Sequence, residues 1–571
     1  MTRTLVIQLG RLGDVVQTTP LLGDLAASGD QVDVLVLHST HTALLGFSAI
    51  ADIITISDSL KTLDDAIACE FPHGKILVEA HELLADLQLP LYDRVINASH
   101  APLGCWLAGA ISCTNPNARY GGVIRACECL YFGPASAYRV ALLLFREQNL
   151  FNLVDLIRAA PGTVSPSAPP RSYANKSVEL PFALPPGRRV ALNPGASELA
   201  RCWPIENFAR IAESLAVAGF SPLLVGAPSD RELCEKIRSS ARVAIPNFAG
   251  RTSIPEMAAV LASCELLICG DTGAAHLAAA VGTTVLGLYG AAAWFAETAP
   301  YGNNHLVLQT PLNAPMSAIS IDSAVAAALH RLGHLSVADL RRELRAQNQS
   351  AWETSLQPAT SHDPLGGLTY HPIHRESATP DEPFAQALRN ASAAEFLTPA
   401  SPSHRTQVPS ADPQCPHASL AEILDHMQTL ADGCAESTLT GAVSSETEAS
   451  ASALIAAMER LRELSAEPTW KRFRPVIHHH DWQLRMLPQQ SPDATFRSYG
   501  QAYASAARIL KNADADHRST SVETDLVESN EYWKGVTTKG KKRGGTGASF
   551  GEDTGTCPSA RVGLAMNDSC E

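Results

Sequence analysis

The chain has 571 residues, a hydrophobic fraction of 45% and a formal net charge of -14. At roughly 100–200 residues per domain, this length predicts two to four domains, each able to bury its own core. The negative charge repels phosphate backbones and argues against nucleic-acid binding. The thirteen cysteines are odd in number and irregularly spaced, which argues against a disulfide scaffold and favours a reduced, cytoplasmic setting. No signal peptide or apolar membrane-spanning run is recognised.

The first segment alternates strand and helix patterns. Thr4–Leu9 is an apolar run that predicts a strand, and the turn Gly10–Asp14 follows it. A helix is expected over Val15–Ala27 and a second buried strand over Val32–Leu37. Arg94–Asn97 is a further strand candidate. A strand, turn, helix and strand in this order form the basic unit of a parallel sheet.

The second segment begins after a Pro-, Ser- and Ala-rich stretch, Pro161–Pro186, which we interpret as a linker between domains. Strands are expected at 189–192, 222–225, 265–269 and 283–289. Helices are expected after Pro204, after the capping-box spacings Ser229 to Glu232 and Ser253 to Glu256, and over 274–280. Alternation at this pitch predicts a doubly wound, open parallel sheet.

The composition changes after about residue 335, where Pro, Ser, Thr, Ala and Glu dominate and strands are expected to disappear. We therefore divide the chain into residues 1–175, residues 186–335 and an accessory region, 336–571, that is partly helical and partly disordered. Three weak signals fall in the accessory region: a basic run near Lys541, the triplet His478–His480, and the pair Asp514 and Asp516. A solvated tail is the favoured interpretation of the first, and metal binding is not expected of the others.

The strongest local motif is Cys269–Ala278, which follows a buried strand and opens a helix. A helix N-terminus favours a phosphate, and Gly273 allows one to approach the backbone. Thr272 adds a hydroxyl, while Asp271 suits a helix cap or a sugar hydroxyl. A plain helix cap and a core histidine at His276 are the competing interpretations.

Two further motifs point to the same chemistry. Arg201 precedes Trp203-Pro204 at a helix start, and an arginine there can bind a diphosphate through paired hydrogen bonds. A solvated loop arginine is the alternative.

Asp14 ends the G-x-x-G-D turn, which is neither a dinucleotide fingerprint nor a P-loop. It is interpreted either as a helix cap or as a general base facing a cleft between the domains.

Together these motifs resemble glycosyltransferase family 9, the bacterial heptosyltransferase family, over roughly residues 1–335. The resemblance implies a GT-B fold of two facing Rossmann-like domains with open parallel sheets, with the acceptor bound by the first domain and the donor by the second. It implies that Asp14 is the catalytic base and that Arg201, where many members have Lys, contacts the donor phosphate. It also places Asp271, Thr272, Gly273 and His276 at the donor.

The resemblance further implies an acidic residue on the donor ribose, which maps to Glu232 or to Asp230. The implied reaction is an inverting transfer from a nucleotide-diphosphate sugar to a glycan or lipid-linked acceptor of a bacterial surface polysaccharide. No metal and no cofactor are expected, and peripheral contact with the inner membrane is left open. The alternatives are a nucleotide-sugar epimerase of similar fold and a non-catalytic assembly protein with a relict transferase core.

Overall fold

The computed structural model describes most of residues 1–373, and the chain after residue 373 lies outside the described part. Within that span, the positions not described are 46, 62–81, 100, 116–117, 126–127, 133–134, 136–148, 150, 160–177, 199–200, 291–292, 312–313 and 358–366. Most of the expected linker therefore lies outside the described residues. So do the accessory helices expected further on, the basic run, the histidine triplet and the Asp514 and Asp516 pair.

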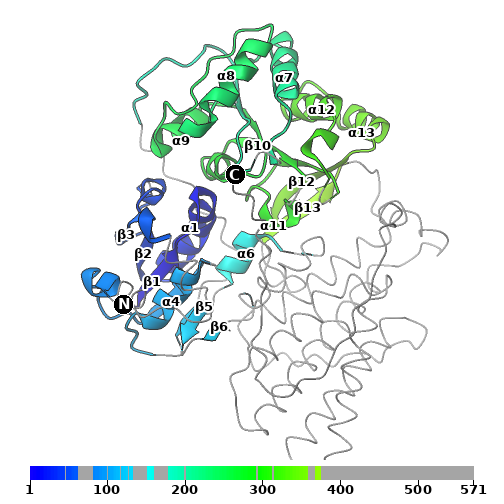
Figure 1. Ribbon diagram of the computed structural model, residues 1–571. Helices are drawn as coiled ribbons and strands as arrows, with labels where there is room; N and C mark the ends of the chain where they lie inside the picture. Colours follow the sequence, from blue (N-terminus) through cyan, green and yellow to red (C-terminus); the bar gives the residue numbers. More distant parts are fainter. Residues whose placement is uncertain are drawn as a thin grey trace, which may run out of the picture. The chain divides into compact units, whose positions relative to one another are not determined.

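The first sheet has six strands in the order β3-β2-β1-β4-β5-β6, coloured blue to cyan in Figure 1. The strands are β1 (Arg3–Gln8), β2 (Gln31–Leu37), β3 (Asp52–Ile56), β4 (Arg94–Asn97), β5 (Arg119–Arg125) and β6 (Glu128–Phe132). All neighbours are parallel except β5 and β6. The three strands expected from the sequence in this part of the chain are confirmed.

Helices cover both faces of the first sheet. Leu5 and Ile7 of β1 pack in one apolar cluster with α4 (Pro102–Ala110). Val6 points the other way and packs with α1 (Leu12–Ala27). Because successive side chains of a strand alternate between faces, a strand buried on both sides reads as a continuous apolar run. That is why the strand at the start of the chain was predictable.

The second sheet has seven strands in the order β13-β12-β11-β10-β9-β7-β8. Its strands are β7 (Arg189–Asn193), β8 (Ser221–Leu224), β9 (Leu266–Cys269), β10 (Thr284–Tyr289), β11 (Leu306–Gln309), β12 (Ser350–Gln357) and β13 (Gly367–Pro372). Five neighbouring strands of this sheet are parallel: β8, β7, β9, β10 and β11. Strands β12 and β13 continue the sheet beyond β11 as two antiparallel strands at its edge.

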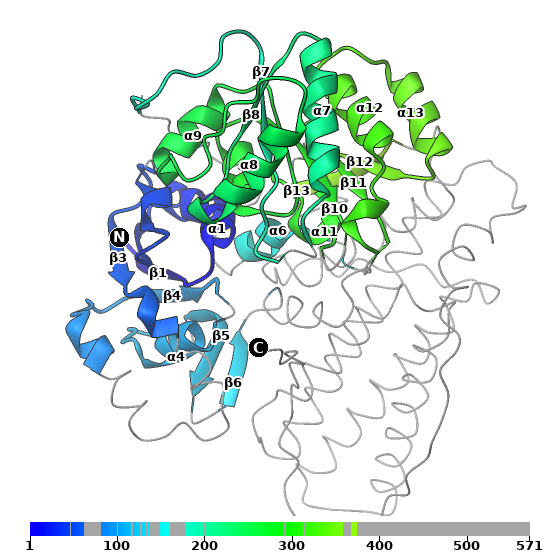
Figure 2. The ribbon, with the colours of Figure 1, turned by 45° about the horizontal axis from the view of Figure 1, so that its top comes forward.

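Helices also cover both faces of the second sheet (Figure 2). Side chains of α7, α8, α12 and α13 share one cluster with the sheet, and side chains of α9 and α10 share the cluster on the other face. Their bounds are α7 (Ile205–Val217), α8 (Arg231–Ser240), α9 (Ile254–Ala262), α10 (Gly273–Ala280), α12 (Ile321–Arg331) and α13 (Val337–Ala346). None of the helices in the described ranges is both long and apolar enough to cross a membrane.

The expectation that strands disappear after about residue 335 is wrong. Helix α13 and strands β12 and β13 all lie beyond that point, and both strands belong to the second sheet. The boundary expected at 335 is therefore too early. β12 escaped prediction because only Ala351 and Thr354 of its eight residues are buried, so its sequence lacks a strong apolar pattern.

One of the two predicted capping boxes is confirmed. Ser253 and Glu256 exchange hydrogen bonds at the start of α9. The prediction of a capping box from Ser229 to Glu232 is wrong, because α8 begins at Arg231, directly after Asp230. The carboxylate of Asp230 accepts the backbone N–H of Ala227 at this helix start. Glu232 instead forms an ion pair one turn further along its own helix.

Both sheets belong to the same compact unit of the chain, and the short helix α6 (Leu153–Arg158) contacts elements of each. Arg158 donates two hydrogen bonds to the buried carboxylate of Asp24 on α1. Asp155, on the same helix, accepts a hydrogen bond from the hydroxyl of Tyr301. Tyr301 belongs to the second lobe, which is the second sheet with its helices, as the first lobe is the first sheet with its helices. Asn152 caps α6 and donates to the carbonyl of Ala299. These contacts connect α6 to both halves of the core.

Candidate active site

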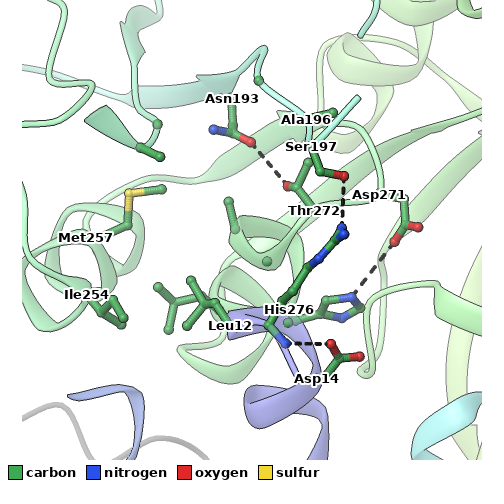
Figure 3. Close-up of a pocket in the computed structure, with 18 of the residues that line it drawn as sticks. Leu12, Asp14, Asn193, Ala196, Ser197, Ile254, Met257, Asp271, Thr272 and His276 are labelled. Carbon is green, nitrogen blue, oxygen red and sulfur yellow. Dashed lines mark hydrogen bonds and ion pairs between the residues drawn. The ribbon is translucent and has the colours of Figure 1, made fainter. Parts of the chain in front are cut away.

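A pocket of about 990 Å³ collects loops from both sheets. Its walls include the turn after β1 and the loops that follow β7, β8 and β9. All four loops leave the carboxyl ends of parallel strands, which is where doubly wound sheets bind ligands. Figure 3 shows how side chains from these loops converge. At the start of α9, Ile254 and Met257 add an apolar portion of the wall.

Asp14 lies in the first turn of α1 and lines this pocket. Its Oδ2 accepts the backbone N–H of Arg11 at 2.9 Å (Figure 3). Asp14 therefore caps α1 from within its first turn and is not the N-cap residue, which is Arg11 because the helix begins at Leu12 and not at Val15 as expected. A side chain at Gly10 would place its Cβ 2.6 Å from the same oxygen. The glycine therefore provides the space that the carboxylate occupies.

The N-terminal ends of α1 and α10 meet at the pocket. A Cβ on Gly13 would lie 3.0 Å from Cδ2 of His276, and a Cβ on Gly273 would lie 3.2 Å from the backbone nitrogen of Gly13. Glycine at both positions favours this close approach, because a Cβ at either would force the opposite turn to shift by a few tenths of an ångström. Each helix start carries unpaired N–H groups and partial positive charge, so two such ends in one pocket favour an anionic ligand.

The Asp271–Gly273 turn is held from the neighbouring loops. Asp271 forms an ion pair with Arg201, with 2.5 Å between Oδ2 and Nη2. The hydroxyl of Thr272 donates to Oδ1 of Asn193 at 3.1 Å (Figure 3). Because that hydroxyl proton is already used, the donors that this turn offers to a phosphate are backbone N–H groups.

His276 is a buried, neutral ring between two carboxylates. Burial lowers its pKa to about 4, although the charge of Asp14 acts in the opposite direction. Its Nε2 lies 4.0 Å from Oδ1 of Asp271. At neutral pH the ring is therefore uncharged and can take part in hydrogen bonds, but it does not supply a positive charge for a diphosphate.

Several residues that line the pocket carry a buried polar atom without a hydrogen-bond partner in the part of the chain that the structure describes. The atoms are Nε2 of Gln17, Nε of Arg201, Nδ1 of His276 and Oγ1 of Thr298. Buried polar atoms are nearly always paired in native proteins, and each exception points to strain, a functional role, or a bound water or ion. Their gathering in one pocket marks it as a binding site for a polar ligand.

The structure brings together six of the seven residues expected at the site. Asp14, Arg201 and His276 all line the pocket, together with the Asp271–Gly273 turn. Glu232 does not line it; this carboxylate is exposed and paired with Lys236. Asp230, the other residue considered for the same role, does line the pocket.

The sequence analysis missed other residues of the site. Arg11 donates from Nη1 to the hydroxyl of Ser197 at 2.9 Å, which links the turn after β1 to the loop after β7. Asn193 and Gln17 also line the pocket. Gln17 could have been found, since it lies three residues after Asp14 and hence on the same face of a helix. Within the described ranges, no three His, Cys, Asp or Glu residues form a group that could hold a metal ion.

The family model for glycosyltransferase family 9 (heptosyltransferase) matches residues 164–320. This stretch carries Arg201 and the Asp271–Gly273 turn of the pocket. Residues 164–320 of the chain are thus similar to glycosyltransferase family 9. The chain is a glycosyltransferase with a GT-B fold, in which two doubly wound sheets each contribute strand-end loops to one pocket.

Several curated relatives of this chain are heptosyltransferases. Lipopolysaccharide heptosyltransferase 3 of Escherichia coli is 23% identical over 288 residues, which are 49% of this chain and 81% of that protein. The lipopolysaccharide core heptosyltransferase OpsX of Haemophilus influenzae is 31% identical over 120 residues, 20% of this chain and 34% of that protein. The match to OpsX therefore spans about a third of its length.

Solved structures that are similar to this chain include E. coli heptosyltransferase WaaC with ADP. It is 20% identical in sequence with a TM-score of 0.44, and the match covers 58% of this chain and 100% of that chain. A family 9 glycosyl transferase from Veillonella parvula has 20% identity and a TM-score of 0.45, and covers 58% and 97% of the two chains.

Proposed function

We propose that this glycosyltransferase moves a heptose from ADP-heptose to a glycan or lipid-linked acceptor of the lipopolysaccharide type, with inversion at the anomeric carbon. The sugar and the acceptor class are suggested by the curated relatives, which are lipopolysaccharide and lipooligosaccharide heptosyltransferases. One observation carries the reaction type: the carboxylate of Asp14 and the N-terminus of α10 line one pocket from opposite lobes.

In the proposed reaction, Asp14 accepts the proton of an acceptor hydroxyl. The freed oxygen attacks the anomeric carbon on the face opposite the diphosphate, the bond between that carbon and the diphosphate oxygen breaks, and the configuration inverts. The transition state has oxocarbenium character, as in related sugar chemistry. The hydrogen bond from the backbone of Arg11 keeps the carboxylate of Asp14 oriented.

Negative charge grows on the departing diphosphate as this bond breaks. The backbone N–H groups at Gly273 and the guanidinium of Arg201 are the donors proposed for it, because both line the pocket and Nε of Arg201 is still unpaired within the described residues. Fixed donors and dipoles stabilise developing charge at little reorganisation cost. With this positive charge supplied by the protein, we expect no obligate metal or other cofactor, and turnover should persist in excess EDTA.

The loop after β8 is proposed to hold the nucleoside. Asp230 lines the pocket, and a side chain at Gly195 or Gly226 would overlap its carboxyl group. We therefore assign the ribose hydroxyls to Asp230 in preference to Glu232. The apolar wall at Ile254 and Met257 suits the nucleobase.

The test uses the full chain, ADP-heptose and a lipopolysaccharide acceptor lacking its outer core. The expected result is ADP release that requires both substrates, with no stimulation by UDP-sugars. Conversion of the donor in acceptor-free buffer would instead show an epimerase, and absence of any turnover would contradict the transferase.

A lipid-linked acceptor would bring the enzyme to the inner face of the membrane. Sedimentation with vesicles that contain the acceptor, compared with sedimentation with acceptor-free vesicles, would measure this association.

A further inference from the structure

Gln17 is a buried polar residue of the pocket to which no role has yet been given. It lies on α1 three residues after Asp14, or about 4.5 Å along the helix axis, and it is 5% exposed. Its side chain lines the pocket, and its Nε2 has no hydrogen-bond partner in the described part of the chain. Asp14 and Gln17 therefore present two polar groups from one helix face to the same space.

A second unpaired polar atom lies on the helix opposite. His276 of α10 also lines the pocket, and its Nδ1 is buried without a partner among the described residues. Both side chains also line a smaller cavity of about 130 Å³, which is bounded further by Tyr301 and Gly302. Gln17 and His276 thus form a shared wall between the two cavities, with unsatisfied nitrogen atoms contributed from both lobes.

An amide buried without a hydrogen bond destabilises a folded protein, whereas a leucine of similar volume would not. Gln17 shares the wall of the smaller cavity with the apolar residues Val16, Val154 and Ala279, so packing alone does not explain a glutamine. A polar group retained at such a cost needs a hydrogen-bond partner, and a bound substrate can supply one.

The chemistry of the two groups identifies the kind of partner. An amide has both donor and acceptor atoms, and a neutral imidazole nitrogen acts as either according to its tautomer. A sugar hydroxyl donates one hydrogen bond and accepts others, and it matches this pair without adding charge. A phosphate oxygen fits less well, because the pair offers it no positive charge.

We propose that Gln17 is a substrate-binding residue whose amide, together with Nδ1 of His276, holds a sugar hydroxyl next to the carboxylate of Asp14. This inference rests on the proposed function, since it presumes that a sugar occupies the pocket. The hydroxyl belongs either to the transferred sugar or to the acceptor, and the two sources share the same chemistry.

The test replaces the amide by an apolar group of similar volume, Gln17→Leu. Thr19→Val is the matched control, because Thr19 lies on the same helix and lines only the smaller cavity, and its hydroxyl already donates to the carbonyl of Val16. Three quantities are compared in both variants and the unaltered chain: the melting temperature without ligand, the Kd values for ADP and for ADP-heptose, and KM for the lipopolysaccharide acceptor.

The expected result is that Gln17→Leu melts at an equal or higher temperature and binds ADP unchanged. Its affinity for ADP-heptose, or its KM for the acceptor, should worsen about two- to tenfold, as the loss of one neutral hydrogen bond predicts. Weaker ADP-heptose binding assigns the hydroxyl to the donor sugar, and a raised acceptor KM assigns it to the acceptor. Thr19→Val should change neither constant.

Two results would overturn the proposal. One is unchanged affinity for ADP-heptose together with unchanged acceptor KM in Gln17→Leu. The other is a clear fall in melting temperature without ligand, because that would show the amide stabilising the fold. If the unaltered chain binds ADP but neither binds nor turns over ADP-heptose, the proposed function fails instead, and the melting temperatures still decide whether the amide of Gln17 is unsatisfied in the folded protein.

Discussion

Arg201 and Asp271 form an ion pair, with 2.5 Å between Nη2 and Oδ2, although they are 70 positions apart in the chain. The pair uses Nη2, while Nε of the same guanidinium is buried without a partner among the described residues. The pair also connects the loop after β7 to the turn after β9. An arginine held at one end in this way is oriented before the donor binds, which lowers the entropic cost of binding a diphosphate.

Replacement of Arg201 should separate the effect of charge from that of geometry. Arg201→Lys keeps the positive charge but loses the planar fork, so we expect kcat to fall about tenfold. Arg201→Gln removes the charge from the departing diphosphate, and a fall of about a hundredfold or more is expected. Steady-state ADP release measures both, and equal rates for the two variants would contradict a role for the charge.

Replacement of Asp14 by Asn should abolish most turnover. The amide cannot accept the acceptor proton, so kcat should fall about a hundredfold or more, while ADP-heptose binds unchanged. The Asn oxygen can still accept the N–H of Arg11, which preserves the helix start. Glu206→Gln is the control, because Glu206 is an exposed carboxylate in the first turn of α7. A variant of Asp14 with full turnover would remove the proposed base.

Gly10→Ala should impair catalysis through Asp14. The new methyl group would lie 2.6 Å from Oδ2 of Asp14, so the carboxylate must move, and a displacement of this size costs about tenfold to a hundredfold in rate. A double-mutant cycle checks the cause. In the Asp14→Asn background, Gly10→Ala should have little further effect, and additive losses would show that the glycine acts elsewhere.

The burial of His276 predicts a pH dependence of stability. Its pKa is about 4 in the folded protein, below the ordinary value of 6.5. Between these values the unfolded chain binds a proton that the folded chain does not, so the free energy of unfolding falls as the pH is lowered from 6.5 towards 4. The full effect is about 3 kcal/mol. Urea unfolding at several pH values measures it, and His276→Gln should lose this part of the slope while the carboxylate contributions remain.

The contact between Arg158 and Asp24 should stabilise the fold. Both side chains are buried, at 2% and 5% exposure, and Arg158 also donates to the hydroxyl of Tyr301. Arg158→Met removes these bonds from buried groups, and we expect a loss of about 3 kcal/mol in urea unfolding. Arg188→Met breaks an exposed pair with Glu265 and should change little. Equal effects of the two replacements would show that burial of the pair is unimportant.

Strands β1, β2 and β4 of the first sheet and the parallel strands β7 to β10 of the second were predicted from the sequence, because buried parallel strands read as local apolar runs. Strands β3, β5, β6 and β11 were not predicted. The Asp271–Gly273 turn and the Asp14 turn were recognisable for a similar reason, since strand ends and helix starts are encoded within a few neighbouring residues. β12 was missed because its pairing with β11 buries few of its own residues, and the evidence for the strand lies in a partner distant in sequence.

The sequence by itself thus determined two strand-helix lobes and most of the polar groups that serve them. Only the tertiary structure decided how those groups combine: it paired Arg201 with Asp271, brought Asp230 and not Glu232 to the pocket, and set Gln17 opposite His276. The physical reason is the separation along the chain of the residues that create each feature. Helix starts and apolar runs depend on neighbours along the chain, whereas ion pairs and unsatisfied buried atoms depend on segments that meet only when the two sheets fold together.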